Sequence, residues 1–393
     1  MFSHQYVIGL YGNKRLGVMF NHYTLINLGD LTNFNGDKLF QKDYISAKKK
    51  FSELVNKANF DKVIEAKIEG LDPMGNELST IIAIKSPNAK KILIHSSGVH
   101  GVEGFSGSAV QCKLIENMNS WVNEEICVVF IHIVNPWGMA WNRRVNQNNV
   151  DLNRNFIENG GHKGTPHNYD KISPWINKKA PPKITDFYWL KALSLLIKYG
   201  NTSLKQCIAE GQYEDENGIF YGGKKLEKEF ENILDALGDI PLGKDVGMII
   251  DMHTGLGKFG IDSLIVSENG ASFEISELKS VFGSKIEEAS TEGVSYTNRG
   301  GYPEGIMATW NNVKWGAITQ EFGTYGEKGM LKKVIDENRL SQWSGLTQKQ
   351  LCNHPIRMKF AKSFNPNNKK WRDLILEEGV NLFQKSMYFL NSK

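Results

Sequence analysis

The chain has 393 residues, and its 47 lysines and arginines against 43 aspartates and glutamates give a formal net charge of +4. This small charge is spread along the whole chain, which excludes the concentrated basic field of a nucleic-acid-binding protein. Hydrophobic residues make up 40% of the chain, enough for a substantial core in one large domain or two. We therefore expect a globular protein without a nucleic-acid partner.

Membrane insertion and secretion are not expected. No uninterrupted apolar stretch reaches the roughly 18 residues of a membrane span. The N-terminal region has only a short apolar patch, Val7–Tyr11, and its basic residues follow that patch, whereas a secretory signal places them first. The four cysteines lie far apart and form no CxxC pair, which favours reduced thiols over a zinc site. These features predict a cytoplasmic protein without a membrane partner.

The expected elements alternate between helices and strands. Apolar residues three and four positions apart predict a helix over 43–58, and strands at 63–70 and 78–86 flank a turn cluster, as in a β-hairpin. Near-continuous apolar runs predict buried strands, which are typical of an α/β sheet covered by helices, at 91–97, 125–135 and 246–255. Further strands are expected at 260–268, as a neighbour of 246–255, and at 317–325. Further helices are expected at 104–118, 186–199, 202–211, 224–237, 272–283, 327–342 and 368–391, the last two on the outside of the sheet.

The remaining stretches are expected to be irregular. Residues 1–38 show no clear period and are interpreted as an N-terminal extension to one catalytic domain over 39–393. Residues 135–156 are rich in asparagine and hold three arginines, and a loop of this length is uncommon unless it has a function. Residues 160–183 and 294–316 are also expected to be loops.

A histidine and a glutamate, His100 and Glu103, follow the buried strand 91–97. Ligands in α/β sheets bind beyond the carboxyl ends of the strands. Glycines at positions 98, 101 and 104 let the backbone fold back so that both side chains can aim at one point. A chance pair of surface residues is the alternative interpretation.

His253 ends another buried strand, and Asp251, two residues earlier, lies on the same face of that strand. The aspartate could hold the second ring nitrogen and fix the tautomer, as metal-binding histidines require. A hydrogen-bonded core histidine is the alternative, and His132, which lacks such a neighbour, is interpreted as structural. Two histidines and a glutamate can bind one zinc ion and leave a position open for water.

Glu321 lies between apolar residues in the expected strand 317–325. A buried, unpaired carboxylate is costly, so this side chain is exposed at an edge, paired, or an acid or base with a raised pKa. Arg144 and Arg154, the latter beside Asn153, belong to the asparagine-rich loop. Arginine loops usually make surface ion pairs, but a guanidinium near a metal site also suits a substrate carboxylate or a developing oxyanion.

In this order, these segments resemble the zinc carboxypeptidases of the M14 clan, and more closely the bacterial DUF2817 branch of that clan. The resemblance covers about residues 40–390 and rests on four blocks, GVHGVEGF (98–105), NPWG…RRVNQNNVDLNRNF (135–156), FYGG (220–223) and QEFGTY (320–325). It implies a mixed, mostly parallel sheet with helices on both faces. It also implies one Zn²⁺ ion bound by His100, Glu103 and His253.

The resemblance further implies a role for the side chains around that ion. Glu321 would be the general base on the zinc-bound water, and Arg144 would help to polarise the scissile carbonyl. Asn153 and Arg154 would hold the terminal carboxylate of the substrate. A mobile tyrosine of the family would correspond to Tyr302 or to the tyrosine at position 296.

The implied activity is that of a zinc metallopeptidase of carboxypeptidase type, acting on a small peptide or an N-acyl amino acid. A deacylase of the aspartoacylase or succinylglutamate desuccinylase kind uses the same ligands and is the first alternative. A non-catalytic binding module on the same scaffold is the second. Asp251 and His95 are the nearest candidates for a second metal ion, and no feature of the sequence indicates an oligomeric state.

Overall fold

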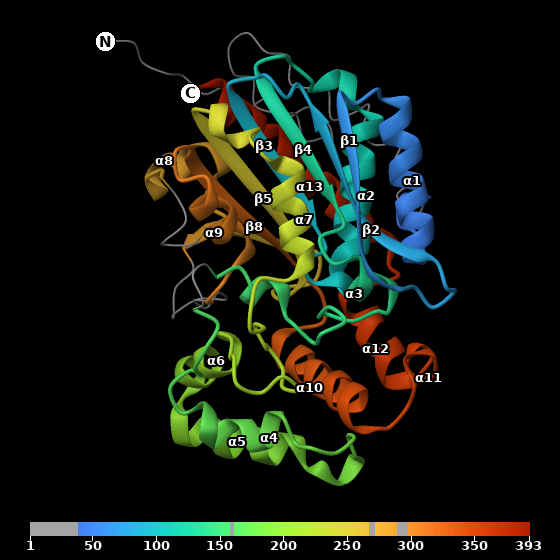
Figure 1. Cartoon of the computed structure of the whole chain (residues 1–393). Coiled ribbons are helices and arrows are strands. Elements are labelled where there is room, and N and C mark those ends of the chain that lie inside the picture. Colours follow the sequence, from blue (N-terminus) through green and yellow to red (C-terminus); the bar gives the residue numbers. More distant parts are fainter. Residues whose placement is uncertain (1–37, 158–160, 267–271, 289–297) are drawn as a thin grey trace, which may run out of the picture.

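A central β-sheet organises the chain in a computed structural model that describes residues 38–157, 161–266, 272–288 and 298–393 (Figure 1). Within these residues the sheet has eight strands, in the order β1-β2-β4-β3-β5-β8-β6-β7. The strands are β1 (Lys62–Leu71), β2 (Glu77–Lys85), β3 (Lys91–Ser97), β4 (Ile126–His132), β5 (Val246–Gly255), β6 (Asp262–Val266), β7 (Ile286–Glu288) and β8 (Lys314–Gly323). The expected N-terminal extension lies outside the described residues, apart from its last residue.

The four central strands, β4, β3, β5 and β8, run parallel to one another. On one side β1 and β2 form the predicted hairpin, and on the other side β6 is antiparallel to β8. The predicted mixed, mostly parallel sheet is therefore confirmed. The predicted pairing of β6 with β5 is wrong, because β8 lies between them. Nearly all residues of β8 are buried, which suits a central position, whereas burial alternates along β6.

Helices cover both faces of the sheet, as predicted. The helices are α1 (Tyr44–Lys57), α2 (Gly104–Glu116), α3 (Pro136–Ala140), α4 (Tyr169–Ile176), α5 (Tyr188–Tyr199), α6 (Asn201–Ala209), α7 (Lys228–Leu237), α8 (Ile275–Phe282), α9 (Tyr302–Thr309), α10 (Glu327–Trp343), α11 (Gln348–Cys352), α12 (Pro355–Phe364) and α13 (Lys369–Asn391). One apolar core joins the sheet to α1, α2, α8 and α13, and a second joins its other face to α7 and α9. Among the described residues, no helix combines the length and the apolar character needed to cross a bilayer.

A group of helices lies beyond the end of the sheet where β3 and β5 finish (Figure 1). Helices α4, α5 and α6 form a separate apolar core there, which includes Ile172, Leu195 and Ile208, and α10 contributes Ile335 to it. The prediction that residues 327–342 pack on the outside of the sheet is therefore wrong for α10, which packs against α12 and this core. Helix α13 does pack on the sheet, as predicted.

Three short helices, α3, α4 and α9, lie in stretches that were expected to be irregular. Each contains a proline, which hides the apolar period of a helix in the sequence. In α3 the proline is in the first turn, where it is tolerated, and the side chain of Asn135 accepts a hydrogen bond from the Gly138 N–H at the start of the helix. The four cysteines are free, as predicted.

Candidate metal centre

The sheet face beneath α7 and α9 changes from apolar to polar along the central strands. Ile94, Ile249 and Ala317 belong to the apolar core on this face. Because residues two positions apart on a strand share a face, the same face continues toward the carboxyl ends with polar residues. These buried polar residues are Ser96, Asp251, His253 and Glu321.

The register of the strands brings three distant segments together. His253 of β5 and Glu321 of β8 are direct partners in a parallel pair, so their side chains leave the same face of the sheet on adjacent strands. The last residue of β3, Ser97, pairs with Met252, and His100 follows β3 after three residues. The candidate ligands therefore meet at the carboxyl edge, where α/β sheets place their ligands.

The possible metal-ligand atoms of three side chains lie close together, those of His100, Glu103 and His253. The Nδ1 atoms of the two histidines are 3.1 Å apart. Glu103 Oε1 lies 3.0 Å from His100 Nδ1, and Oε2 lies 3.3 Å from His253 Nδ1. Around a tetrahedral zinc ion with ligand bonds of about 2.0–2.1 Å, ligand atoms are roughly 3.4 Å apart, so the spacing suits one ion. The described part of the chain holds no other group of this kind.

The second ring nitrogen of each histidine faces an aspartate. His100 Nε2 lies 3.1 Å from Asp151 Oδ1, and His253 Nε2 lies 2.7 Å from Asp251 Oδ2. An Nε2–H that donates to a carboxylate leaves the lone pair on Nδ1 directed at the other ligands. Two Nδ1 lone pairs and the Glu103 carboxylate then face one point, and this donor set fits a cation.

The electrostatics of the site also favour positive charge at this point. Burial disfavours a charged imidazole, but the Asp251 and Glu103 carboxylates outweigh burial and hold the pKa of His253 well above its ordinary value. Burial likewise opposes ionisation of Glu103, yet the neighbouring His100 and His253 hold the pKa of this carboxyl below its usual range. A buried carboxylate is thus kept ionised among the candidate ligands.

Glu321 is buried next to these ligands, so of the alternatives that its sequence left open, exposure at an edge does not apply. Its Oε1 accepts a hydrogen bond of 2.9 Å from the Leu256 N–H, which fixes one carboxylate oxygen. Burial, and then the negative charge of Glu103, raise the pKa of Glu321 to about 8. A carboxyl group with a raised pKa beside a metal site is suited to proton transfer.

Arg144 lies beside the same site. Its Nε donates to Asp151 Oδ2 at 2.9 Å, and its Nη1 lies 3.5 Å from Glu103 Oε1. The guanidinium carbon is 5.2 Å from the centre of the Phe220 ring, which belongs to the FYGG block. The structure therefore brings Arg144 together with His100, Glu103, His253 and Glu321.

Arg154 is fully buried, and its guanidinium is engaged with the backbone. Its Nε and Nη2 donate to the Ala209 carbonyl at 2.9 and 2.6 Å, and its Nη1 donates to the Asn153 carbonyl. These contacts hold the loop of residues 135–156 against the end of α6. The predicted contact of Arg154 with a substrate carboxylate stays a prediction.

Asn153 and Tyr302 are joined to each other at the start of α9. The Tyr302 N–H donates to Asn153 Oδ1 at 2.9 Å. The tyrosine ring is buried and stacks on Phe230, with ring centres 5.5 Å apart and an interplanar angle of 9°. Burial raises the pKa of the Tyr302 hydroxyl. In this arrangement the ring is packed into the core, and the other candidate, position 296, lies outside the described residues.

Asp151 is the site residue that sequence reasoning missed. Burial opposes its ionisation, but Arg144 and His100 hold the pKa of its carboxyl well below the ordinary value. The signal was present in the VDLNRNF block, because an aspartate at the start of a turn, two residues before Asn153, commonly caps that turn. In the structure Asp151 caps this turn, since its Oδ1 accepts a hydrogen bond from the Asn153 N–H at 3.1 Å, and the same carboxylate also contacts His100.

His95 and His132 do not join the site. His95 packs between the Phe130 and Phe383 rings on the opposite face of the sheet, and burial lowers its pKa to about 3. It is therefore not brought together with Asp251 as a second metal site. His132 stacks on Phe51, with ring centres 4.1 Å apart, in agreement with the structural role predicted for it.

Comparisons with known proteins were made against sequence families, curated proteins and solved structures. The model of a family described as "Protein of unknown function (DUF2817)" matches residues 40–378. No curated protein matches the chain. Bovine thrombin-activatable fibrinolysis inhibitor, solved in complex with tick carboxypeptidase inhibitor, is 13% identical with a TM-score of 0.38, over 88% of this chain and 99% of that one.

Two bacterial structures are similar at the same level. A metallo-carboxypeptidase from Burkholderia cenocepacia is 13% identical with a TM-score of 0.36, over 85% of this chain and 68% of that one. The murein-tripeptide amidase MpaA from Escherichia coli O157 is 16% identical with a TM-score of 0.33, over 74% of this chain and 93% of that one.

Proposed function

The chain belongs to the DUF2817 family, and we propose that it is a zinc-dependent hydrolase that cleaves an amide bond next to a free carboxylate. One observation carries the proposal. The Nδ1 atoms of His100 and His253 and the carboxylate of Glu103 face a single point, with Glu321 on the adjacent strand. Three protein ligands of this kind leave the fourth position of a zinc ion open for water or substrate.

The roles of the side chains follow from their positions. A zinc ion bound there would supply Lewis-acid chemistry, which lowers the pKa of water to about 7 and polarises a carbonyl. Glu321, fixed by the Leu256 N–H, would accept a proton from the attacking water and return it to the leaving amine. The Arg144 guanidinium would stabilise negative charge on the carbonyl oxygen. Asp151 and Asp251 would keep both imidazoles in the required tautomer.

The preference for a free carboxylate is supported by a pair of cations. The guanidinium carbons of Arg144 and Arg154 lie 5.2 and 5.7 Å from the centre of the same Phe220 ring. A guanidinium matches a carboxylate in shape and keeps its charge when water is removed. We expect Arg144 to make the first contact, because Arg154 is fully buried whereas part of the Arg144 side chain is exposed.

The test combines metal analysis with a substrate comparison on the purified full chain. We expect about one zinc per chain, and hydrolysis of either N-acyl amino acids or short peptides, which separates the deacylase from the peptidase. Amidation of the substrate carboxylate should lower kcat/KM by about 100-fold, the scale of removing one charged hydrogen-bonding partner from a buried site. Equal turnover of the amidated substrate would contradict the carboxylate requirement.

The role of Glu321 needs a variant that keeps the metal. Glu321→Gln should retain zinc and lose about 100- to 10,000-fold in kcat, the range for general acid–base catalysis. Glu229→Gln is the matched control, because Glu229 is also a buried glutamate but lies in the first turn of α7, where it contacts Asn146. Retention of full activity in Glu321→Gln would overturn the proposed base, and a wild-type chain without stoichiometric metal would overturn the hydrolase.

A further inference from the structure

Large apolar side chains gather on one exposed surface at α5. Leu190, Leu193 and Ile197 follow one another at helical spacing of three and four, so they share a face, and Leu190 and Ile197 are 67% and 78% exposed. We call this the α5 surface and define it by its exposed apolar residues, Ile184, Phe187, Trp189, Leu190, Leu193 and Ile197. A contiguous exposed apolar patch of this kind marks an interaction site.

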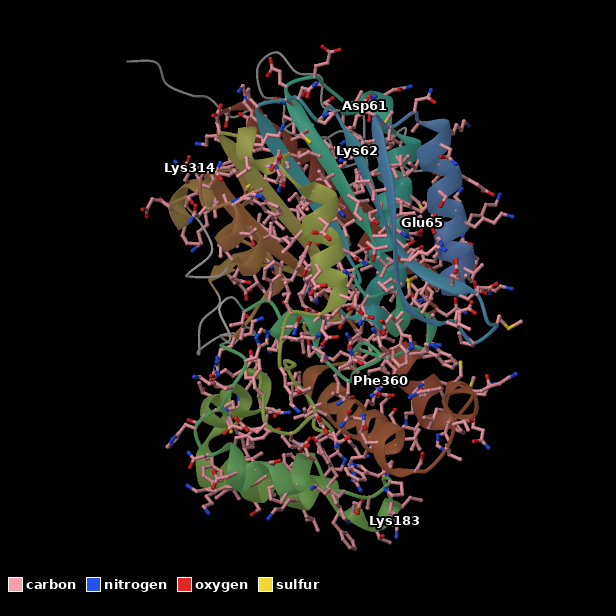
Figure 2. All side chains as sticks on the ribbon, viewed as in Figure 1. Asp61, Lys62, Glu65, Lys183, Lys314 and Phe360 are labelled. Atoms are coloured by element: carbon pink, nitrogen blue, oxygen red, sulfur yellow. The ribbon has the colours of Figure 1, made fainter. Side chains whose placement is uncertain are left out.

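The opposite face of α5 already has its packing partners. Leu195 is buried, and Tyr188, Leu196 and Tyr199 pack against the core of the helical group. The apolar residues of the α5 surface are therefore not needed to attach the helix to the protein. Helices α4 and α5 form the outer edge of this group, away from the sheet, and Lys183 projects at that edge (Figures 1 and 2).

Lysines outnumber acidic residues in the stretch of sequence that contains α5. Between positions 171 and 200 the exposed lysines are Lys171, Lys178, Lys179, Lys183, Lys191 and Lys198. Asp186 is the single acidic residue of this stretch, and its carboxylate already pairs with Lys178 at 2.6 Å and Arg339 at 2.9 Å. The surface thus combines apolar side chains, including a tryptophan, with a strong excess of positive charge.

We infer that the α5 surface binds an anionic phospholipid membrane, with its apolar residues inserted into the interface and its lysines on the headgroups. Amphipathic helices with Trp, Phe and Leu beside lysines bind membranes in this way, parallel to the surface. Each lysine near an anionic surface strengthens binding by about fivefold. At 12 residues α5 is about 18 Å long, too short to span a bilayer, so the contact is peripheral.

A second copy of the chain fits this surface less well. A two-fold dimer places the same patch of both subunits face to face, which here would set the lysines of one α5 against those of the other, while Asp186, the one acidic residue between positions 171 and 200, is already paired. An anionic membrane instead supplies the opposite charge. The inference departs from the sequence-based expectation of no membrane partner, which rested on the lack of a spanning stretch, and it is independent of the hydrolase.

The experiment is co-sedimentation of the full chain with sucrose-loaded vesicles. Vesicles of phosphatidylcholine alone are compared with vesicles that contain phosphatidylglycerol. We expect binding to the anionic vesicles only, and weaker binding when salt rises from about 0.1 M to about 1 M, where the screening length falls from about 10 Å to about 3 Å. Absence of binding to anionic vesicles, or equal binding to both kinds, would overturn the inference.

Two pairs of variants assign the binding to the α5 surface. Leu193→Glu with Ile197→Glu should reduce vesicle binding at least about tenfold, whereas Leu242→Glu, at another exposed leucine, should not. The triple variant Lys183→Glu, Lys191→Glu, Lys198→Glu should reduce binding by about 100-fold or more, whereas the control Lys42→Glu, Lys62→Glu, Lys90→Glu, also at exposed lysines, should reduce it far less. Unchanged melting temperatures show that the variants are folded.

The same samples separate the membrane from a second copy of the chain. Sedimentation equilibrium should give the same oligomeric state for the wild-type chain and the Leu193→Glu, Ile197→Glu variant. A wild-type dimer that is lost in this variant, together with the absence of vesicle binding, would assign the surface to self-association and overturn the inference. Hydrolysis of a soluble substrate should be unchanged in all these variants, so failure here leaves the hydrolase proposal standing.

Discussion

Two neighbouring arginines, Arg143 and Arg144, lie in buried ionic clusters of opposite character. Arg143 donates from Nε to Glu337 Oε1 at 3.1 Å, and Arg357 pairs with the same carboxylate at 2.9 Å. The Nη2 group of Arg143 donates to the neutral side-chain oxygen of Asn149. We call Arg143, Glu337 and Arg357 the Glu337 cluster. In this cluster two guanidinium groups of the protein contact a single carboxylate.

The metal centre has the opposite excess. Arg144 is the guanidinium that faces Glu103 and Asp151, while the site also includes two further buried carboxyl groups, those of Asp251 and Glu321. Buried carboxylates without a counter-charge are strongly disfavoured. The Glu337 carboxylate is neutralised by guanidinium groups of the protein itself and so stabilises the fold, whereas a site that converges with surplus negative charge requires a cation from outside. The following predictions probe this difference.

The largest effect is expected from removing one ligand of the metal centre. His253→Ala should leave the chain without stoichiometric zinc and lower hydrolysis by about 1,000-fold or more, because the lost ligand removes the metal and with it the activated water. Metal content and kcat/KM are measured on the same sample. If His253→Ala retains zinc and activity, the ion is not held by this trio.

The second largest effect concerns the Glu337 cluster and stability alone. Glu337→Gln leaves two buried guanidinium groups without their carboxylate and should lower the free energy of unfolding by about 3–5 kcal/mol. Urea unfolding measures the loss. Zinc content should be unchanged in the folded fraction, because no atom of Glu337 contacts the metal centre in the described structure. Loss of zinc from folded protein would mean that the two clusters are coupled.

The contrast between the two arginines also shows what sequence can predict. The metal ligands could be predicted, because they follow apolar strands whose carboxyl ends meet in any parallel sheet. The fate of Arg143 could not, because its partner Glu337 lies 194 residues away in the sequence. For the same reason the partnership of Asp151 with His100 was missed, although the motif that contains it was recognised.

At the level of the fold, long apolar runs identified the central strands and the alternating spacing identified the hairpin. The position of β6 depends on which strand fills the centre, a choice that local pattern does not encode. The burial of Tyr302 depends on its stacking with Phe230, which comes from another helix. Features determined by contacts between distant segments therefore escaped prediction.

Glu229 is a buried carboxyl group outside both clusters, and it shows the effect of burial on a pKa where neither a metal site nor a guanidinium is the partner. Burial, together with the charge of Glu227, raises the pKa of Glu229 from 4.5 to about 7. The folded protein therefore keeps a proton that the unfolded chain loses above pH 4.5, so the stabilisation is complete below that pH. It declines by about 1.4 kcal/mol per pH unit as the pH rises toward 7, and levels off above it.

Glu229→Gln should remove this slope. Relative to wild type, the variant should gain up to about 3 kcal/mol in the free energy of unfolding between pH 4.5 and pH 7, and no more at higher pH. Urea unfolding at several pH values provides the measurement, with zinc content as the control. A difference between variant and wild type that does not change with pH would show that Glu229 is ionised in the folded protein.

The smallest effect separates a ligand from its support. Asp251 accepts from His253 Nε2 at 2.7 Å and from the Ser96 hydroxyl at 2.9 Å, so Asp251→Asn keeps the shape of the contact and removes its charge. Zinc affinity, measured by competition with a chelator, should fall about 10- to 100-fold. Asp262→Asn is the matched control, because Asp262 is also buried but contacts Lys285 and, on the neighbouring strand β8, Gln320. If both variants bind zinc as tightly as wild type, the charge of Asp251 does not support the ligand, and the negative charge that distinguishes this site from the Glu337 cluster is carried by Glu103 and Asp151, whose pKa values are held low.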